Sequence, residues 1–115
     1  AFRMLRRLLS LLLCLAAALV VFWPQPAWAA PDGVQLFENH CAGCHINGGN
    51  IIRRGKTLKL AALQRNGIDG PEDIAAIAAG GIGQMGGYGD VLGEGGPQAV
   101  GLWVWQQAEA GWPKV

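Results

Sequence analysis

The sequence predicts an all-α fold in which helices are joined by long, glycine-rich connections. Apolar residues recur at helical spacing in several segments, and no segment shows the apolar–polar alternation of a strand. Pro71 and Pro97 stand where helices begin, and the pair Gly80-Gly81 stands where one ends. The sequence contains no internal repeat. We therefore expect one small domain with about four helices.

Local signals place these helices along the chain. Thr57 is a suitable N-cap, and Asn66-Gly67 is a suitable end for the short helix that follows. In the next helix, Glu72 and Asp73 complement the positive N-terminal end. The segment 80–96 is so rich in glycine that we expect a loop. The helices are expected at about 33–42, 57–65, 71–79 and 97–109, with an irregular loop at about 48–56.

Each long helix is expected to bury one apolar face. In the first helix, Val34 and Phe37 share a face. The corresponding faces are Ile74, Ile77 and Ala78 in the third helix, and Val100, Trp103, Val104 and Gln107 in the last. A domain of this size buries only a modest apolar core. An apolar group held inside the domain would therefore supply much of its interior.

The first 29 residues have the pattern of a secretory signal peptide. Three arginines precede an apolar stretch from Leu8 to Phe22. Ala27-Trp28-Ala29 then matches the small-residue pattern of a cleavage site. We therefore expect residues 1–29 to be removed, which leaves a single domain at 30–115.

An uncleaved membrane anchor is the alternative for this segment. The apolar stretch is shorter than the ~20 residues of a spanning helix, and Pro24 and Pro26 interrupt the sequence after it. Arg6-Arg7 also allows a twin-arginine interpretation, although the pair alone is not specific. Cys14 follows Leu13 rather than the small residue of a lipoprotein site, so we expect it to be removed with the leader.

Removing the leader reverses the sign of the net charge. The whole chain has a formal charge of +1, but residues 30–115 hold six basic and eight acidic residues, a formal charge of about −2. This composition leaves no basic excess to bind nucleic acid. The domain retains two cysteines, Cys41 and Cys44.

These two cysteines belong to Cys41-Ala42-Gly43-Cys44-His45, a C-x-x-C-H run typical of c-type haem attachment. The two thiols can add across the two vinyl groups of one haem, which gives two thioether bonds. His45 follows directly and is the expected proximal ligand of the iron. Export agrees with this interpretation, because covalent haem attachment normally takes place on the far side of a membrane.

A dithiol redox pair and half of a zinc site are the alternatives for the C-x-x-C spacing. A redox pair would be accompanied by a βαβ pattern, which the sequence lacks. A zinc site would need a second pair of ligands, and outside the leader only His40 is available. Haem attachment is therefore the interpretation that we adopt.

Met85 is the expected sixth ligand of the iron. It is the only methionine of the mature part, and it lies in the loop between the third and last helices. A thioether ligand favours reduced iron and suits an electron carrier. A lone methionine often fills a core instead, but the glycines around Met85 argue against core packing. His40 is the alternative ligand, although it belongs to the helix that carries the attachment motif.

The sequence resembles cytochrome c6, the class I cytochrome c of oxygenic phototrophs, over nearly the whole mature part. C-x-x-C-H is shared by all c-type cytochromes, whereas the loop and tail segments narrow the resemblance to this type. The matching segments are Gly33 and Phe37, Cys41-Ala42-Gly43-Cys44-His45, Asn47-Gly48-Gly49-Asn50, Lys56-Thr57-Leu58, Ala61-Ala62-Leu63, the Ile74 helix, Met85, Ala99-Val100, Trp103-Val104 and Gln107-Ala108-Glu109-Ala110-Gly111-Trp112.

The resemblance implies the small class I cytochrome c fold around one covalent haem c, in an electron carrier rather than an enzyme. It implies transient electron transfer from cytochrome f of the cytochrome b6f complex to photosystem I or to a terminal oxidase, in the thylakoid lumen or the periplasm. The mature form is expected to be a monomer that does not span a membrane. The first and last helices are expected to cross near Gly33, Phe37 and Trp103, with Gly101 allowing their close approach.

Three positions depart from the family pattern and point to a divergent c6-like paralogue. Gly86 follows Met85 where relatives usually have proline, which stiffens the loop. Ile82 stands where lysine is frequent, and Ile77 stands where many relatives have glutamine near the haem. An apolar residue at 77 is expected to lower the reduction potential, because it removes a polar contact to the haem or its ligand.

Two other functions stay open at this point. A sensor or a redox enzyme subunit would use a c-type haem with a labile sixth ligand, and the glycines around Met85 are compatible with that. Neither alternative finds a distal acid–base pair, since His40 has no evident companion. A haem-free binding module would be colourless after expression with haem-attachment machinery.

Overall fold

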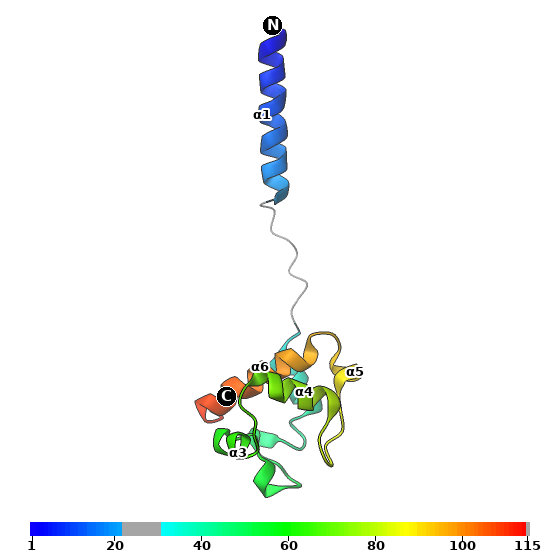
Figure 1. Ribbon diagram of the computed structural model, residues 1–115, viewed down its shortest axis with the longest axis vertical. Coiled ribbons are helices and arrows are strands. Elements are labelled where there is room, and N and C mark those ends of the chain that lie inside the picture. The colour runs from blue at the N-terminus through cyan, green and yellow to red at the C-terminus, as the bar shows by residue number, and fades with distance from the viewer. Residues whose placement is uncertain (22–30, 115) are drawn as a thin grey trace.

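The computed structural model describes residues 1–21 and 31–114. Within these ranges every regular element is a helix, which confirms the all-α prediction (Figure 1). Two short 3₁₀ turns, η1 and η2, lie in the loop after α2. The elements are α1 (Phe2–Val21), α2 (Gly33–His40), η1 (Ile46–Gly48), η2 (Arg54–Lys56), α3 (Leu60–Arg65), α4 (Pro71–Gly80), α5 (Gly89–Leu92) and α6 (Gly96–Ala110).

Helix α1 covers most of the predicted leader. It has no buried residue, and it is long and apolar enough to cross a membrane, a test that a signal sequence near an N-terminus also passes. The helix extends beyond the apolar stretch because it begins at Phe2 and includes the three arginines. Its length therefore does not distinguish an anchor from a leader. The predicted cleavage site at Ala27-Trp28-Ala29 lies outside the described residues.

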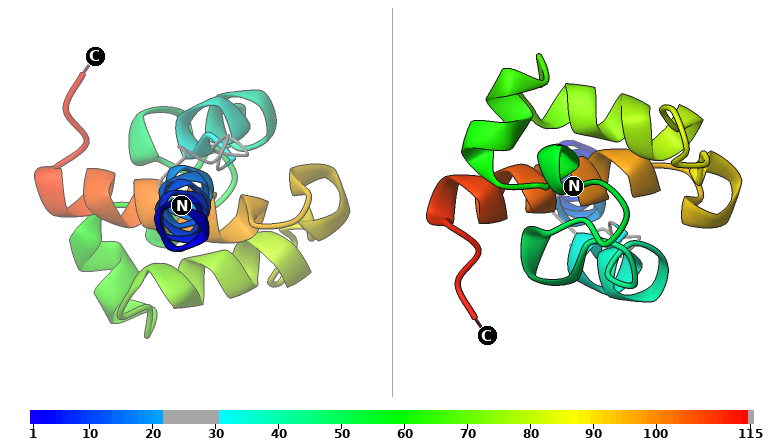
Figure 2. Two further views of the ribbon diagram at one scale, coloured as in Figure 1. Left: turned by 90° about the horizontal axis from the view of Figure 1, so that it is seen from above. Right: turned by 90° about the horizontal axis from the view of Figure 1, so that it is seen from below.

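Helix α6 lies at the centre of the domain, between α2 on one side and α4 on the other (Figure 2). Val100 and Val104 are almost completely buried on α6, as predicted from their spacing. The core that they form draws on every longer helix after α1. Its members are Phe37, Cys41, Leu63, Ile74, Ala78, Leu92, Val100, Val104 and Ala108.

The contact between α2 and α6 is close because Gly33 has no side chain. A Cβ atom there would collide with the carbonyl oxygen of Ala99. Further along α2, the rings of Phe37 and Trp103 lie 4.8 Å apart between centroids. The predicted crossing near these residues is confirmed. Val34, however, is exposed, and it is Leu36 that packs beside the core.

Gly101 serves the other face of α6, contrary to the prediction. A Cβ atom at Gly101 would lie 2.5 Å from the carbonyl oxygen of Pro71 and 3.0 Å from the backbone nitrogen of Ala75. This glycine therefore allows α4, not α2, to approach α6. On α4 itself, Ile74 and Ala78 are buried as predicted, while Ile77 is only half-buried.

Two local predictions were wrong. Thr57 does not cap α3, which begins at Leu60 after the N-cap Lys59. Thr57 is extended, and the backbone N–H of Leu58 donates to the carbonyl of Gly48 over 2.7 Å, so tertiary pairing replaces the cap. The segment 80–96 also contains the short helix α5, where burial of Leu92 in the core overrides the glycine-rich composition.

The α4–α6 contact generates a stability prediction. Gly101→Ala is expected to lower the free energy of unfolding by about 1–3 kcal/mol, because the added methyl group meets backbone atoms that no rotamer change can move. Guanidinium unfolding of the purified domain measures the effect.

Gly80→Ala is the matched control for this measurement. Gly80 is the last residue of α4, and a Cβ atom there meets nothing within 4 Å. This variant is expected to be neutral or to gain up to about 1 kcal/mol. Equal unfolding midpoints for the two variants would contradict the role of Gly101.

Candidate haem site

The attachment motif begins where α2 ends. Cys41 is the C-cap residue of α2, and its backbone N–H donates to the carbonyl of Phe37. The backbone N–H groups of Cys44 and His45 both donate to the carbonyl of Cys41, over 3.2 and 3.0 Å. A tight turn thus brings the two thiols and the imidazole to one end of α2. The structure brings these three predicted site residues together.

The two thiols have different surroundings. Cys41 is buried in the core, whereas Cys44 is exposed, and neither forms a disulfide. Burial raises the pKa of the Cys41 thiol above its usual value, because a thiolate is disfavoured away from water. Because neither sulfur is in a disulfide, both thiols are free to form thioether bonds.

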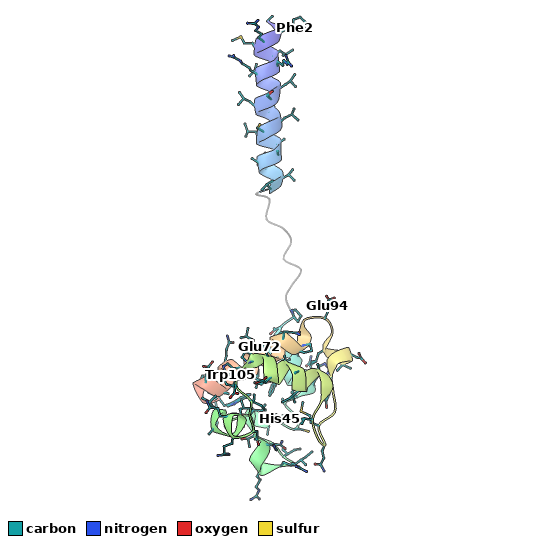
Figure 3. All side chains as sticks on the ribbon, viewed as in Figure 1. Phe2, His45, Glu72, Glu94 and Trp105 are labelled. Carbon is teal, nitrogen blue, oxygen red and sulfur yellow. The ribbon has the colours of Figure 1, made fainter. Side chains whose placement is uncertain are left out.

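His45 is held by a hydrogen bond that sequence analysis missed. Its Nδ1 atom lies 2.8 Å from the carbonyl oxygen of Gly49. A carbonyl oxygen can only accept, so Nδ1 carries the proton and the lone pair of the neutral ring is on Nε2. This is how proteins orient an imidazole that ligates a metal through its other nitrogen. The residue is half-buried, and in the view of Figure 3 it is labelled below α4.

Backbone hydrogen bonds fix the loop that presents the Gly49 carbonyl. The N–H of Gly48 donates to the carbonyl of His45, and that of Gly49 to the carbonyl of Ile46, over 3.0 and 2.9 Å. Asn47, between Ile46 and Gly48, adopts a positive φ of 54°. The N–H of Ile51 donates to the carbonyl of Cys44. The loop after the motif is therefore ordered by its own backbone.

Trp112 ties this loop to the C-terminal end of α6. Its indole N–H donates to the carbonyl of Leu58 over 2.9 Å. The indole covers Gly48 so closely that a Cβ atom there would lie 2.5 Å from the Trp112 ring carbon Cδ2. Trp112 also packs against Phe37 and Trp103, with ring centroids 5.7 Å away in each pair. Asn47-Gly48-Gly49 and the tail were recognised as family-like segments, but their contact is visible only in three dimensions.

Met85, the predicted sixth ligand, lies in a separate loop between α4 and α5. It is half-buried, and its backbone is paired with that of Ile82 in an isolated bridge. The residues from the end of α4 to Tyr88 turn back so that the N–H of Tyr88 donates to the carbonyl of Ala78 over 2.8 Å. The loop is therefore anchored at the C-terminal end of α4. The alternative ligand His40 is the last residue of α2.

The zinc interpretation finds no support in the described part of the chain. Among residues 1–21 and 31–114, no group of three or more His, Cys, Asp or Glu side chains could hold a metal ion. The neighbours of Cys41 in the core are mainly aliphatic and aromatic residues. Two free thiols, an imidazole with Nε2 available and an apolar interior fit a covalently attached haem.

Comparison with known proteins identifies the family. The sequence model of the family described as cytochrome c oxidase, cbb3-type, subunit III matches residues 29–104. A cytochrome c6-like protein of Nostoc sp. strain PCC 7120 is 51% identical over 81 residues, which cover 70% of this chain and 73% of the relative. The chain belongs to the cytochrome c6-like family.

Solved structures of cytochrome c6 paralogues share the fold of this cytochrome c6-like chain. Cytochrome c6B from Synechococcus sp. WH8102 is 60% identical, with a TM-score of 0.71 and coverage of 76% of this chain and 99% of that one. Cytochrome c6C from Synechococcus sp. PCC 7002 is 51% identical, with a TM-score of 0.65 and coverage of 68% and 95%. The resemblance inferred from the sequence is confirmed, as is the class I cytochrome c fold.

Membership of the cytochrome c6-like family establishes the cofactor and the general activity. The chain carries one covalently bound haem c, and it is an electron carrier rather than an enzyme. The paralogues among the similar structures agree with the divergence inferred from Ile77, Ile82 and Gly86.

Proposed function

We propose that this c6-like protein is exported and carries electrons by means of a haem attached through Cys41 and Cys44, with His45 and Met85 as axial ligands. The observation that supports it most directly is the hydrogen bond between His45 Nδ1 and the Gly49 carbonyl. That bond leaves Nε2 free beside two unpaired thiols at the end of α2. Met85 supplies the soft sulfur that suits an electron carrier.

The bound haem would supply one-electron chemistry between ferric and ferrous iron. The chain's own residues set the conditions for it. His45 presents a fixed nitrogen, and its Nδ1–H···O=C bond keeps the ring in one tautomer. Met85 would supply the other ligand of the iron, which would leave no position open to oxygen. The buried core around Cys41 keeps water from that side of the site.

The proposed partners are cytochrome f of the cytochrome b6f complex as donor, and photosystem I or a terminal oxidase as acceptor. This assignment rests on the resemblance to cytochrome c6 as a class. Ile77 and Gly86 favour a second candidate, a specialised paralogue that exchanges electrons with a different pair. The thylakoid lumen and the periplasm are the proposed compartments, with residues 1–29 as the cleaved leader.

Expression of the whole chain together with haem-attachment machinery tests export and attachment in one experiment. The intact mass of the purified protein is expected to equal residues 30–115 plus one haem. A variant carrying both Cys41→Ser and Cys44→Ser is the control and is expected to lack covalent haem. An unaltered protein without covalent haem would contradict attachment through Cys41 and Cys44, and a mass that includes residues 1–29 would exclude cleavage.

Met85→Ala is expected to remove the sixth ligand. The ferric form of the unaltered protein is expected to show the weak far-red band of methionine–iron ligation, and this variant is expected to lose it. The ferrous variant is expected to bind carbon monoxide, since one axial position is open. Its reduction potential is expected to fall, because the thioether favours reduced iron. Optical titration measures all three.

The unaltered protein is the control for carbon monoxide. If it binds the gas as readily as Met85→Ala does at neutral pH, the sixth position is labile. Ligation by Met85 as proposed would then be wrong.

Ile77→Gln is expected to raise the reduction potential. Ile77 is half-buried on α4, and glutamine would offer a donor N–H to the haem or its ligand. A hydrogen bond that stabilises the reduced state by about 1 kcal/mol raises a one-electron potential by roughly 40 mV. Potentiometric titration measures the shift.

Ala76→Gln, on the exposed side of the same helix, is the matched control and is expected to leave the potential unchanged. Equal potentials for Ile77→Gln and the unaltered protein would remove the reason to assign a low potential to Ile77.

A further inference from the structure

The backbone N–H and the backbone carbonyl of Met85 both form hydrogen bonds within its loop. The N–H of Ile82 donates to the carbonyl of Met85, and the N–H of Met85 donates to the carbonyl of Ile82, each over 3.0 Å. The two residues thus close a four-residue turn. Gly83, at the turn, adopts a positive φ of 57°, and a Cβ atom there would meet nothing within 4 Å.

The chain is fixed again directly after Met85. A Cβ atom at Gly87 would lie 2.6 Å from the carbonyl oxygen of Ala79 and 2.9 Å from the carbonyl carbon of Gly80. The next residue, Tyr88, donates its N–H to the carbonyl of Ala78. The chain directly after Met85 is therefore packed against the last turn of α4. Gly86, by contrast, has open space around its Cβ position.

Gly81 makes the closest approach to Met85 itself. It adopts a positive φ of 79°, and a Cβ atom there would lie 2.5 Å from the carbonyl oxygen of Met85. It would also lie 2.8 Å from the carbonyl carbon of Gly86 and from the nitrogen of Gly87. All three neighbours are backbone atoms, so no side-chain rotation can make room. The backbone of Met85 therefore packs directly against Gly81.

We propose that Gly81 is a positioning residue for Met85, and that its packing against the Met85 carbonyl fixes the backbone of the methionine. The residue after Met85 is Gly86, and glycine allows the widest range of backbone conformations of all residues. The position of Met85 is therefore set by contacts on either side of it. Gly81 supplies the entry contact, and Gly87 supplies the exit contact. The proposal rests on the proposed role of Met85 as sixth ligand.

The glycines of this loop provide two matched comparisons. Gly81→Ala and Gly83→Ala both place alanine at a positive φ, but only the first adds a collision with Met85. Gly87→Ala and Gly86→Ala do not involve a positive φ, and only Gly87→Ala adds a collision. The second pair keeps the proposal testable if Gly81→Ala does not fold.

The experiment uses the haem-loaded protein and imidazole as a probe of the sixth position. Gly81→Ala and Gly87→Ala are expected to weaken the far-red band and to raise the affinity of the ferric form for imidazole by about tenfold or more. Gly83→Ala and Gly86→Ala are expected to stay within about twofold of the unaltered protein. Circular dichroism, with unchanged helix content, separates displacement of the ligand from loss of the fold.

The possible results are distinct. Equal imidazole affinities within both pairs, with the far-red band intact in the unaltered protein, would overturn the role of Gly81 and leave Met85 as ligand. Absence of the far-red band from the unaltered protein would overturn the ligation by Met85, and with it the role of Gly81. A tenfold difference within the first pair supports the role of Gly81, and one within the second pair supports the exit contact at Gly87.

Discussion

The close packing of α6 against α2 and α4 is the constraint on which the rest of the structure depends. On one side Gly33 lets α2 meet the backbone of Ala99, and on the other Gly101 lets α6 meet the backbone of Pro71 and Ala75. Helix α2 ends in the attachment motif, and α4 ends in the methionine loop. The position of α6 between them therefore sets where the two halves of the proposed haem site stand relative to one another.

Glycine has a structural role in this domain that its frequency alone does not reveal. Gly48, Gly81 and Gly87 each bring the chain against atoms that leave no room for a Cβ. At Gly81 and Gly87 these atoms belong to the backbone of the same loop or of α4, whereas at Gly48 they belong to the Trp112 indole. The glycine-rich loops of this domain therefore have a defined conformation.

Sequence reasoning predicted the features that depend on neighbouring residues. The limits of α4 followed from Pro71 and Gly80, and the motif was recognisable because Cys41, Cys44 and His45 are nearly contiguous. Predictions that depended on distant parts of the chain were wrong at Thr57 and at Gly101, and the 80–96 loop contains an unforeseen helix. The carbonyl that orients His45 was also missed, since any residue carries a backbone carbonyl and no side-chain pattern marks it.

The contact of Trp112 with Gly48 and Leu58 separates two events in the assembly of the protein. Covalent capture of a haem needs only the two thiols, which lie on one turn of chain. Orientation of the His45 ring needs the Gly49 carbonyl, whose loop is covered by an indole from far along the sequence. In the proposed site, a chain would thus hold its haem before its proximal ligand is oriented. Tuning of the iron by His45 would depend on the completed domain, whereas attachment through Cys41 and Cys44 would depend on a short peptide.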